Sequence, residues 1–118
     1  MLVAKHEKRN GGLILRIKGE LDGSSVIQLD TFLGEAANSH IAHLTLDFSQ
    51  VLRFEYTGIA LSVAVLEFYG EDFSNIVCCG LPENITRILK GLGLDKIPNV
   101  RVAHHSDNLK DLMISNLK

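Results

Sequence analysis

The stretch IAHLTLDFSQVLRFEYTGIALSVAVLEFYG, residues 41–70, is the part of the chain that decides its fold class. Its first eight residues, 41–48, are mostly apolar and predict a buried strand. Residues 51–56 follow no regular pattern, so we expect an irregular segment there. From Gly58 onwards the sequence is apolar on nearly every face of a helix, which is typical of a helix covered on several sides. A buried strand followed by a buried helix is the unit from which α/β proteins are built.

The same unit precedes this stretch. Residues 13–18 predict a strand, and residues 2–4 predict an earlier strand that joins it through a glycine turn to form a hairpin. We expect residues 19–23 to break the second strand. Ser25, with Gln28 three residues later, has the form of a capping box at the start of an amphipathic helix.

The unit also recurs after it. Residues 74–79 predict a short strand, Pro82 suits the first position of a helix, and residues 100–103 predict a last strand. Ser106 or Asp107 is suited to cap a terminal helix. Strands that alternate with helices imply right-handed crossovers and a mostly parallel sheet, so the fold class is α/β. Several helix N-termini then lie at one edge of the sheet, where ligands and partners tend to bind.

Length and composition exclude several classes of protein. With 118 residues we expect one domain over residues 1–118, in which residues 1–10 are a polar lead or a first edge strand. The formal net charge of −2 gives no basic excess for binding nucleic acid, and no apolar run is long enough for direct membrane insertion. The two cysteines, Cys78 and Cys79, are adjacent and cannot form a disulfide framework, so we expect a cytoplasmic protein.

The residues give little support for an enzyme. The sequence has no glycine-rich phosphate loop and no nucleophile elbow. His104 and His105 are neighbours at a strand end and point to opposite faces, while His40 and His43 lack a carboxylate or cysteine at ligand spacing. We therefore expect no catalytic residues, no metal and no cofactor.

Two interpretations of Thr57 follow from its place before the apolar helix. In the first, its hydroxyl caps the helix and does nothing more. In the second, the helix N-terminus tolerates a phosphate on Thr57, and the added charge of about −2 switches a docking surface on or off.

Four motifs in register resemble the STAS domain, the family of bacterial anti-sigma-factor antagonists that also occurs in sulfate transporters and stress-signalling scaffolds. They are G-E-L-D (19–22), L-x-L-D-F-S (44–49), acid-x-[ST]-G (55–58) and C-G-L-P…I…L…G-L (79–94), and the resemblance runs from about residue 13 to 117. It implies a small sheet covered mainly on one side by about four helices. It also implies a regulatory protein-binding module that docks on an anti-sigma factor with a histidine-kinase-like ATPase fold, or on another signalling protein.

The resemblance places the docking surface on the loop before the second helix and on a neighbouring turn: Phe54, Glu55, Tyr56, Thr57 and Gly58, with Asp22, Gly23 and Ser24. Regulated family members carry an acid, a phosphorylated Ser or Thr, a second Ser or Thr, and Gly. Aligned on Gly58, this chain has Tyr56 at the acceptor position, so we expect the usual serine switch to be absent. Three outcomes stay open: Thr57 is phosphorylated instead, Tyr56 is a docking aromatic, or binding is constitutive. We favour the docking role.

The resemblance leaves further alternatives. The runner-up is an accessory STAS subunit of a bacterial ABC-type phospholipid-trafficking transporter, which binds its ATPase. A third is nucleotide binding, as some STAS domains are reported to do, although no phosphate loop supports it. Residues 2–4 could also pair as an edge strand with a second copy to form a homodimer.

Overall fold

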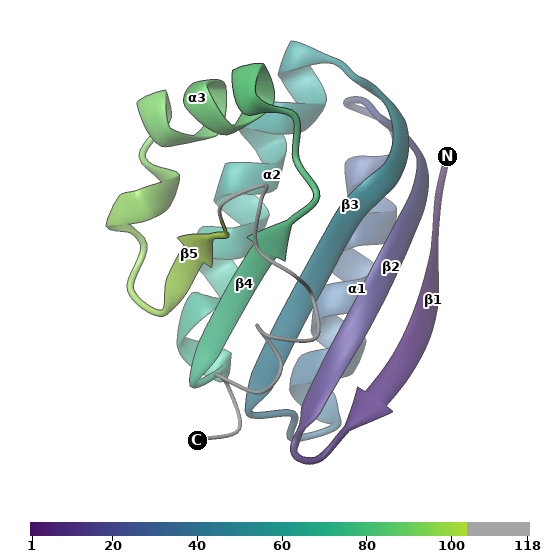
Figure 1. Ribbon diagram of the computed structural model, residues 1–118, viewed down its shortest axis with the longest axis vertical. Helices are drawn as coiled ribbons and strands as arrows, with labels where there is room; N and C mark the ends of the chain where they lie inside the picture. The colour runs from purple at the N-terminus through teal and green to yellow at the C-terminus, as the bar shows by residue number, and fades with distance from the viewer. Residues whose placement is uncertain (104–118) are drawn as a thin grey trace.

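A computed structural model describes residues 1–103, so the predicted terminal helix and the pair His104 and His105 lie outside the described residues. A five-stranded sheet with the strand order β1-β2-β3-β4-β5 carries three α-helices in the described part of the chain (Figure 1). The elements, in chain order, are β1 (Leu2–Arg9), β2 (Gly12–Leu21), α1 (Val26–Asn38), β3 (His43–Phe54), α2 (Tyr56–Tyr69), the 3-10 turn η1 (Gly70–Asp72), β4 (Asn75–Cys79), α3 (Glu83–Gly91), the 3-10 turn η2 (Leu94–Lys96) and β5 (Val100–Val102).

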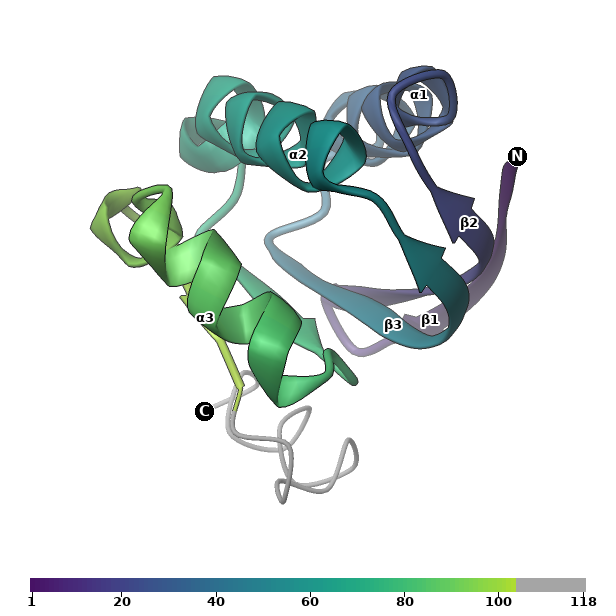
Figure 2. The same ribbon diagram turned by 90° about the horizontal axis from the view of Figure 1, so that it is seen from above.

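The sheet is mixed and mostly parallel, as predicted. β1 runs antiparallel to β2 and forms the expected hairpin, whereas the pairs β2–β3, β3–β4 and β4–β5 are parallel. Seen from above, α1 and α2 lie side by side over one face of the sheet, and α3 lies beside α2 (Figure 2). The resemblance implied about four helices; three fall within residues 1–103, and the α/β class is confirmed.

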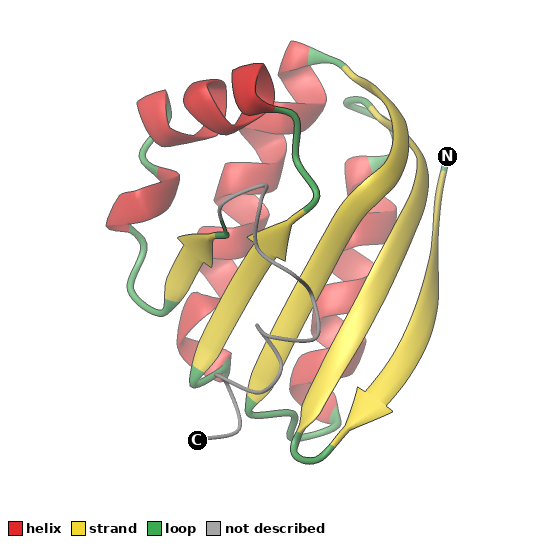
Figure 3. Cartoon of the chain, in the orientation of Figure 1, coloured by secondary structure: helices red, strands yellow, loops and turns green. Residues whose placement is uncertain are grey.

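Figure 3 shows α1 and α2 behind the sheet, and the core lies between these two layers. Alternate residues of β2 and β3 point into it, because successive side chains of a strand face opposite sides. Each such side chain contributes about 1.5–3 kcal/mol when it is fully buried. The residues that are at most 4 % exposed in this core include Leu15, Ile17, Leu29, Leu33, Leu44, Leu46, Phe48, Ile59 and Leu66.

The first three strands are longer than predicted, and the extension of β2 and β3 positions the candidate site. The prediction that residues 19–23 break the strand was wrong, since β2 continues to Leu21, and the expected irregular segment 51–56 is strand as far as Phe54. Gly19 has φ of 122°, and the register shifts beside it, so the chain bulges there and then resumes pairing. Leu21 pairs with Phe54, which brings the ends of the two strands to the same edge of the sheet.

The predicted capping box at Ser25 and the predicted first helical position of Pro82 were also wrong. Ser25 precedes α1, but its side chain makes no capping bond, and the Gln28 side chain instead accepts from the Leu2 N–H at 3.3 Å. Pro82 lies at the N-cap position and α3 begins one residue later. These positions still mark helix starts, although their side chains do not satisfy the N–H groups of the first turn.

Candidate docking site

The end of β2 and the start of α2 are in direct backbone contact. The Glu55 N–H donates to the Leu21 carbonyl oxygen at 2.9 Å. Gly58 allows a closer approach, since a Cβ atom at that position would lie 2.6 Å from the Leu21 oxygen and 2.7 Å from the Asp22 Cα. The two segments that the sequence predicted as one docking surface therefore meet at one edge of the sheet.

The turn after β2 is held by a compact set of hydrogen bonds. The Asp22 carboxylate accepts from the Ser24 hydroxyl at 2.9 Å and from the Ser25 N–H at 2.8 Å. The buried Ser25 hydroxyl accepts from the Asp22 N–H at 2.9 Å and donates to the Glu20 carbonyl at 2.8 Å. The Ser24 hydroxyl, and then the Ser25 N–H, hold the pKa of the Asp22 carboxyl below its usual value because both stabilise the charged form. The turn is thus ordered before any partner binds.

Thr57 is not the helix cap. Glu55 occupies the N-cap position of α2 with no side-chain capping bond, and Thr57 is the second residue of the helix. Its side chain is exposed and its methyl group lies over Gly23, where a Cβ atom would be 3.0 Å from the Thr57 Cγ2. The interpretation of Thr57 as a simple cap is wrong, because the helix begins one residue before it.

Tyr56 and Phe54 flank Glu55 and lie in different surroundings. Tyr56, the first residue of α2, is 62 % exposed, whereas Phe54 is partly buried against the core. The Glu55 carboxylate pairs with Arg53 at 2.9 Å, and the Arg53 Nε lies 3.5 Å from Glu20. Exposed pairs of this kind contribute at most about 1 kcal/mol to stability, so they mainly orient the charges around Tyr56.

Sequence reasoning missed several exposed apolar residues on the elements of this site. Leu52 near the end of β3 is 83 % exposed, and Leu61 and Phe68 on α2 are 43 % and 75 % exposed. α2 is covered on several sides, as predicted, by the sheet, α1 and α3, but Leu61 and Phe68 lie on a remaining face that no described element covers. The signal was present as the all-round apolar pattern, which a core helix and a helix with a docking face share.

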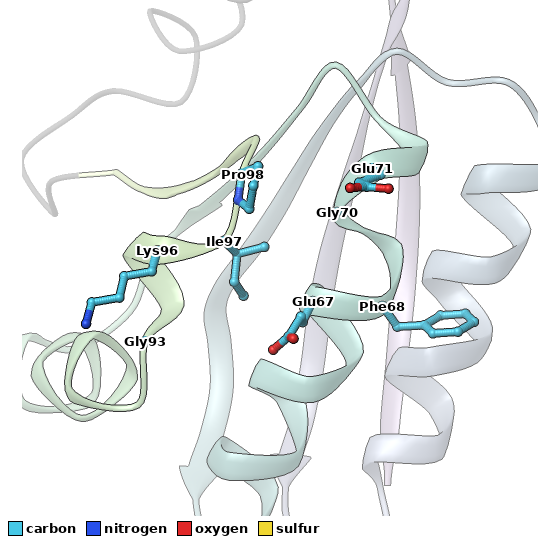
Figure 4. Close-up of a pocket in the computed structure, with 8 residues that line it drawn as sticks. All are labelled: Glu67, Phe68, Gly70, Glu71, Gly93, Lys96, Ile97 and Pro98. Carbon is cyan, nitrogen blue, oxygen red and sulfur yellow. The ribbon is translucent and has the colours of Figure 1, made fainter.

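A shallow hollow of about 530 Å³ lies at the other end of α2 (Figure 4). Glu67 and Glu71 line it together with Lys96 and Ile97 from the η2 region. Phe68 contributes to its rim, but its ring points to the opposite side of α2 from Glu67. The hollow is therefore lined by both acidic and basic side chains.

The remaining reactive groups are buried or dispersed. Burial raises the pKa of both thiols, Cys78 and Cys79, to about 12, so neither is a nucleophile at neutral pH. Residues 1–103 contain no group of three or more His, Cys, Asp or Glu placed to hold a metal ion. In the same part of the chain, no helix is long and apolar enough to cross a membrane.

The fold is shared with solved anti-sigma factor antagonists. An anti-sigma factor antagonist from Mycobacterium paratuberculosis matches with a TM-score of 0.70 and 21% identity over 100% of this chain and 96% of its own. A putative anti-sigma factor antagonist from Thermotoga maritima matches with a TM-score of 0.73 and 15% identity over 98% and 95%. Unphosphorylated SpoIIAA, also an anti-sigma factor antagonist, matches with a TM-score of 0.62 and 13% identity over 98% and 97%. At these identities the likeness shows the fold alone.

The sequence comparisons decide the family. The comparison with curated proteins found no significant match. A family model described as "Mlab, STAS domain" matches residues 5–103, which is most of the chain and includes every segment of the docking site. This chain belongs to the STAS domain family.

Proposed function

We propose that this protein is a regulatory, non-enzymatic module that docks on a signalling protein of the anti-sigma factor or kinase class. The surface it uses comprises the Asp22–Ser24 turn and residues 54–58. The contact of Gly58 and Glu55 with the end of β2 supports this most directly, because it fixes both segments as one surface. A surface ordered in advance loses little conformational entropy when a partner binds.

Tyr56 is the central docking residue of this proposal. Its ring is exposed at the first position of α2, and tyrosine is enriched among the residues that dominate binding energy. We further propose that a serine-type phosphorylation switch is altered here. A kinase site shaped for a short hydroxyl does not reach a phenol oxygen in the same geometry, so Tyr56 is not phosphorylated in the usual way.

Affinity capture with the full chain tests the docking role. The wild-type protein captures a discrete signalling partner from the cells that make it, and mass spectrometry identifies that partner. Tyr56→Ala lowers the captured amount about tenfold or more, as expected for a central aromatic. Val3→Ala is the matched control, since Val3 is an exposed apolar residue on β1 that is not part of the proposed docking surface. Equal capture by Tyr56→Ala and wild type would argue against docking through this surface.

The captured partner also separates the alternatives. A transporter ATPase captured in a Tyr56-dependent way would replace the signalling proposal with the accessory-subunit role. Incubation with the partner and ATP, followed by mass spectrometry, tests the switch. No phosphate, or phosphate on Tyr56, supports the altered switch; stoichiometric phosphate on Thr57 restores the usual one.

A further inference from the structure

The exposed face of α2 carries a continuous stripe of small and apolar side chains. Thr57, Leu61, Ala64 and Phe68 follow one another at spacings of four, three and four residues, which places them on one side of the helix. All four are exposed. The neighbouring helix α1 adds Ile27, which is also exposed. Isolated exposed apolar residues are ordinary, but a contiguous stripe marks an interaction surface.

Phe68 is held in place at the far end of this stripe. Its ring lies 4.9 Å from that of Tyr69 at an interplanar angle of 87°, an edge-to-face arrangement. Tyr69 is partly buried against α1, where a Cβ atom on Gly34 would lie 3.0 Å from its hydroxyl oxygen. Burial, and then the nearby Asp30 carboxylate, raise the pKa of Tyr69. The exposed Phe68 ring thus rests on a fixed neighbour and loses little freedom when it is covered.

The exposed charges on α1, α2 and η1 are all acidic, whereas α3, on the other side of α2, carries the exposed Arg87 and Lys90. The helices α1 and α2 contain no lysine, arginine or histidine, and Arg53 is the only lysine or arginine within residues 19–86. The exposed acids on the two helices and on η1 are Asp30, Glu35, Glu67, Glu71 and Asp72. The acidic surface ends toward η2, where Lys96 lines the same hollow as Glu67 from a different element (Figure 4). A partner that covers the stripe therefore meets apolar side chains and, on the side of α1 and η1, an acidic rim.

This pattern selects among possible occupants. A second copy that docked by the same face would bring the two acidic rims together, since a two-fold interface pairs identical patches. An anionic lipid surface would be repelled for the same reason. A helix with its own apolar stripe and flanking lysines or arginines complements both the shape and the charge.

We propose that the α1–α2 face, from Tyr56 to Phe68, receives a basic amphipathic helix of the protein partner. The proposal rests on the proposed function, because it extends the docking surface at the start of α2 along the whole helix and names the chemistry of the partner's contact. α2 has 14 residues, which corresponds to about 21 Å, so the face accommodates about four helical turns of the partner.

Titration of the full chain with two model peptides tests this. The first is an 18-residue helical peptide of leucine and lysine, and the second has the same leucine stripe with glutamate in place of lysine. The lysine peptide binds and shifts the amide NMR signals of α1 and α2, while the glutamate peptide binds at least tenfold more weakly. Phe68→Ala and Leu61→Ala each weaken the binding of the lysine peptide about tenfold. The Val3→Ala control leaves the affinity for this peptide unchanged. Equal binding of the two peptides, shifts on other elements, or no effect of Phe68→Ala would each overturn the proposal.

Capture of the natural partner separates this inference from the proposed function. Loss of capture by both Tyr56→Ala and Phe68→Ala supports the extended surface. Loss by Tyr56→Ala alone overturns the extended surface and leaves the proposed function standing. If the lysine peptide binds through Phe68 but Tyr56→Ala captures as much partner as wild type, the docking proposal fails and the apolar-acidic face stands.

Discussion

Replacing Gly58 with alanine should damage the contact between α2 and the end of β2. A Cβ atom there would lie 2.6 Å from the Leu21 carbonyl oxygen and 2.7 Å from both the Asp22 Cα and N. Ordinary contact begins near 3.4 Å, so relief requires a shift of about 0.8 Å, from 3.4 minus 2.6. All three atoms belong to backbone, so no side-chain rotation can make room. The first turn of α2 must move, and the bond from the Glu55 N–H to Leu21 weakens with it.

The expected change in the free energy of unfolding of Gly58→Ala is the sum of two opposing effects. Alanine in place of glycine within a helix ordinarily gains about 1 kcal/mol. Overpacking costs about 1–3 kcal/mol, and the rigid surroundings of Gly58 favour the upper end. The net expectation is a loss of about 1–2 kcal/mol in the free energy of unfolding, measured by urea denaturation followed by circular dichroism.

Gly91→Ala supplies the matched control for this prediction. Gly91 is the last residue of α3, and a Cβ atom there meets nothing within 4 Å. The same chemical change should therefore be neutral or stabilise by up to about 1 kcal/mol. If Gly58→Ala is as stable as wild type, or if both variants change the free energy of unfolding in the same direction, Gly58 is not held in a close backbone contact.

Three further predictions concern the same edge and the core. Gly23→Ala crowds the Thr57 methyl group and should lower the free energy of unfolding. Thr57→Ser removes that methyl group and should restore part of the loss, with a coupling of about 0.5–1 kcal/mol in a double-mutant cycle. Strict additivity of the two changes would contradict the contact. Ser25→Ala leaves the partly buried Asp22 N–H and the Glu20 carbonyl without their partner, and it should lower the free energy of unfolding in urea by about 1–3 kcal/mol, well above the loss for the exposed Ser24. Cys78 and Cys79, with pKa of about 12, should resist a maleimide at pH 8 until the chain is unfolded. The thiols of the unfolded chain ionise near pH 9, whereas those of the folded chain stay protonated up to about pH 12. The free energy of unfolding should therefore fall between about pH 9 and 12, and each thiol contributes at most about 1.4 kcal/mol for each pH unit.

The sequence predicted the order of the elements but not where the first three strands end. Residues 19–23, which begin and end with glycine, predict a break in the strand. In the structure the φ of 122° at Gly19 serves a bulge, after which β2 resumes pairing with β3 as far as Leu21 and Phe54. Periodicity within one segment cannot reveal this, since the pairing partner that continues the strand lies more than 30 residues away in sequence.

The candidate site could be predicted in its parts but not in its extent. The resemblance to the STAS family implied that the Asp22 turn and the start of α2 form one surface, and the close approach of Gly58 to Asp22 fits that expectation. The exposed face of α2 could not be predicted, because leucine and phenylalanine in a helix carry the same pattern whether they fill a core or await a partner. Only the packing of the neighbouring helix shows that Leu61 and Phe68 are left uncovered.

The most direct measurement of the central claim is site-specific photo-crosslinking in the cells that make the protein. A benzophenone amino acid replaces Tyr56 in one variant and, as control, the exposed Val3 of β1 in another. If the start of α2 is the docking surface, irradiation yields one discrete protein adduct from position 56 and none from position 3. An adduct from position 3 with none from position 56 would contradict the account.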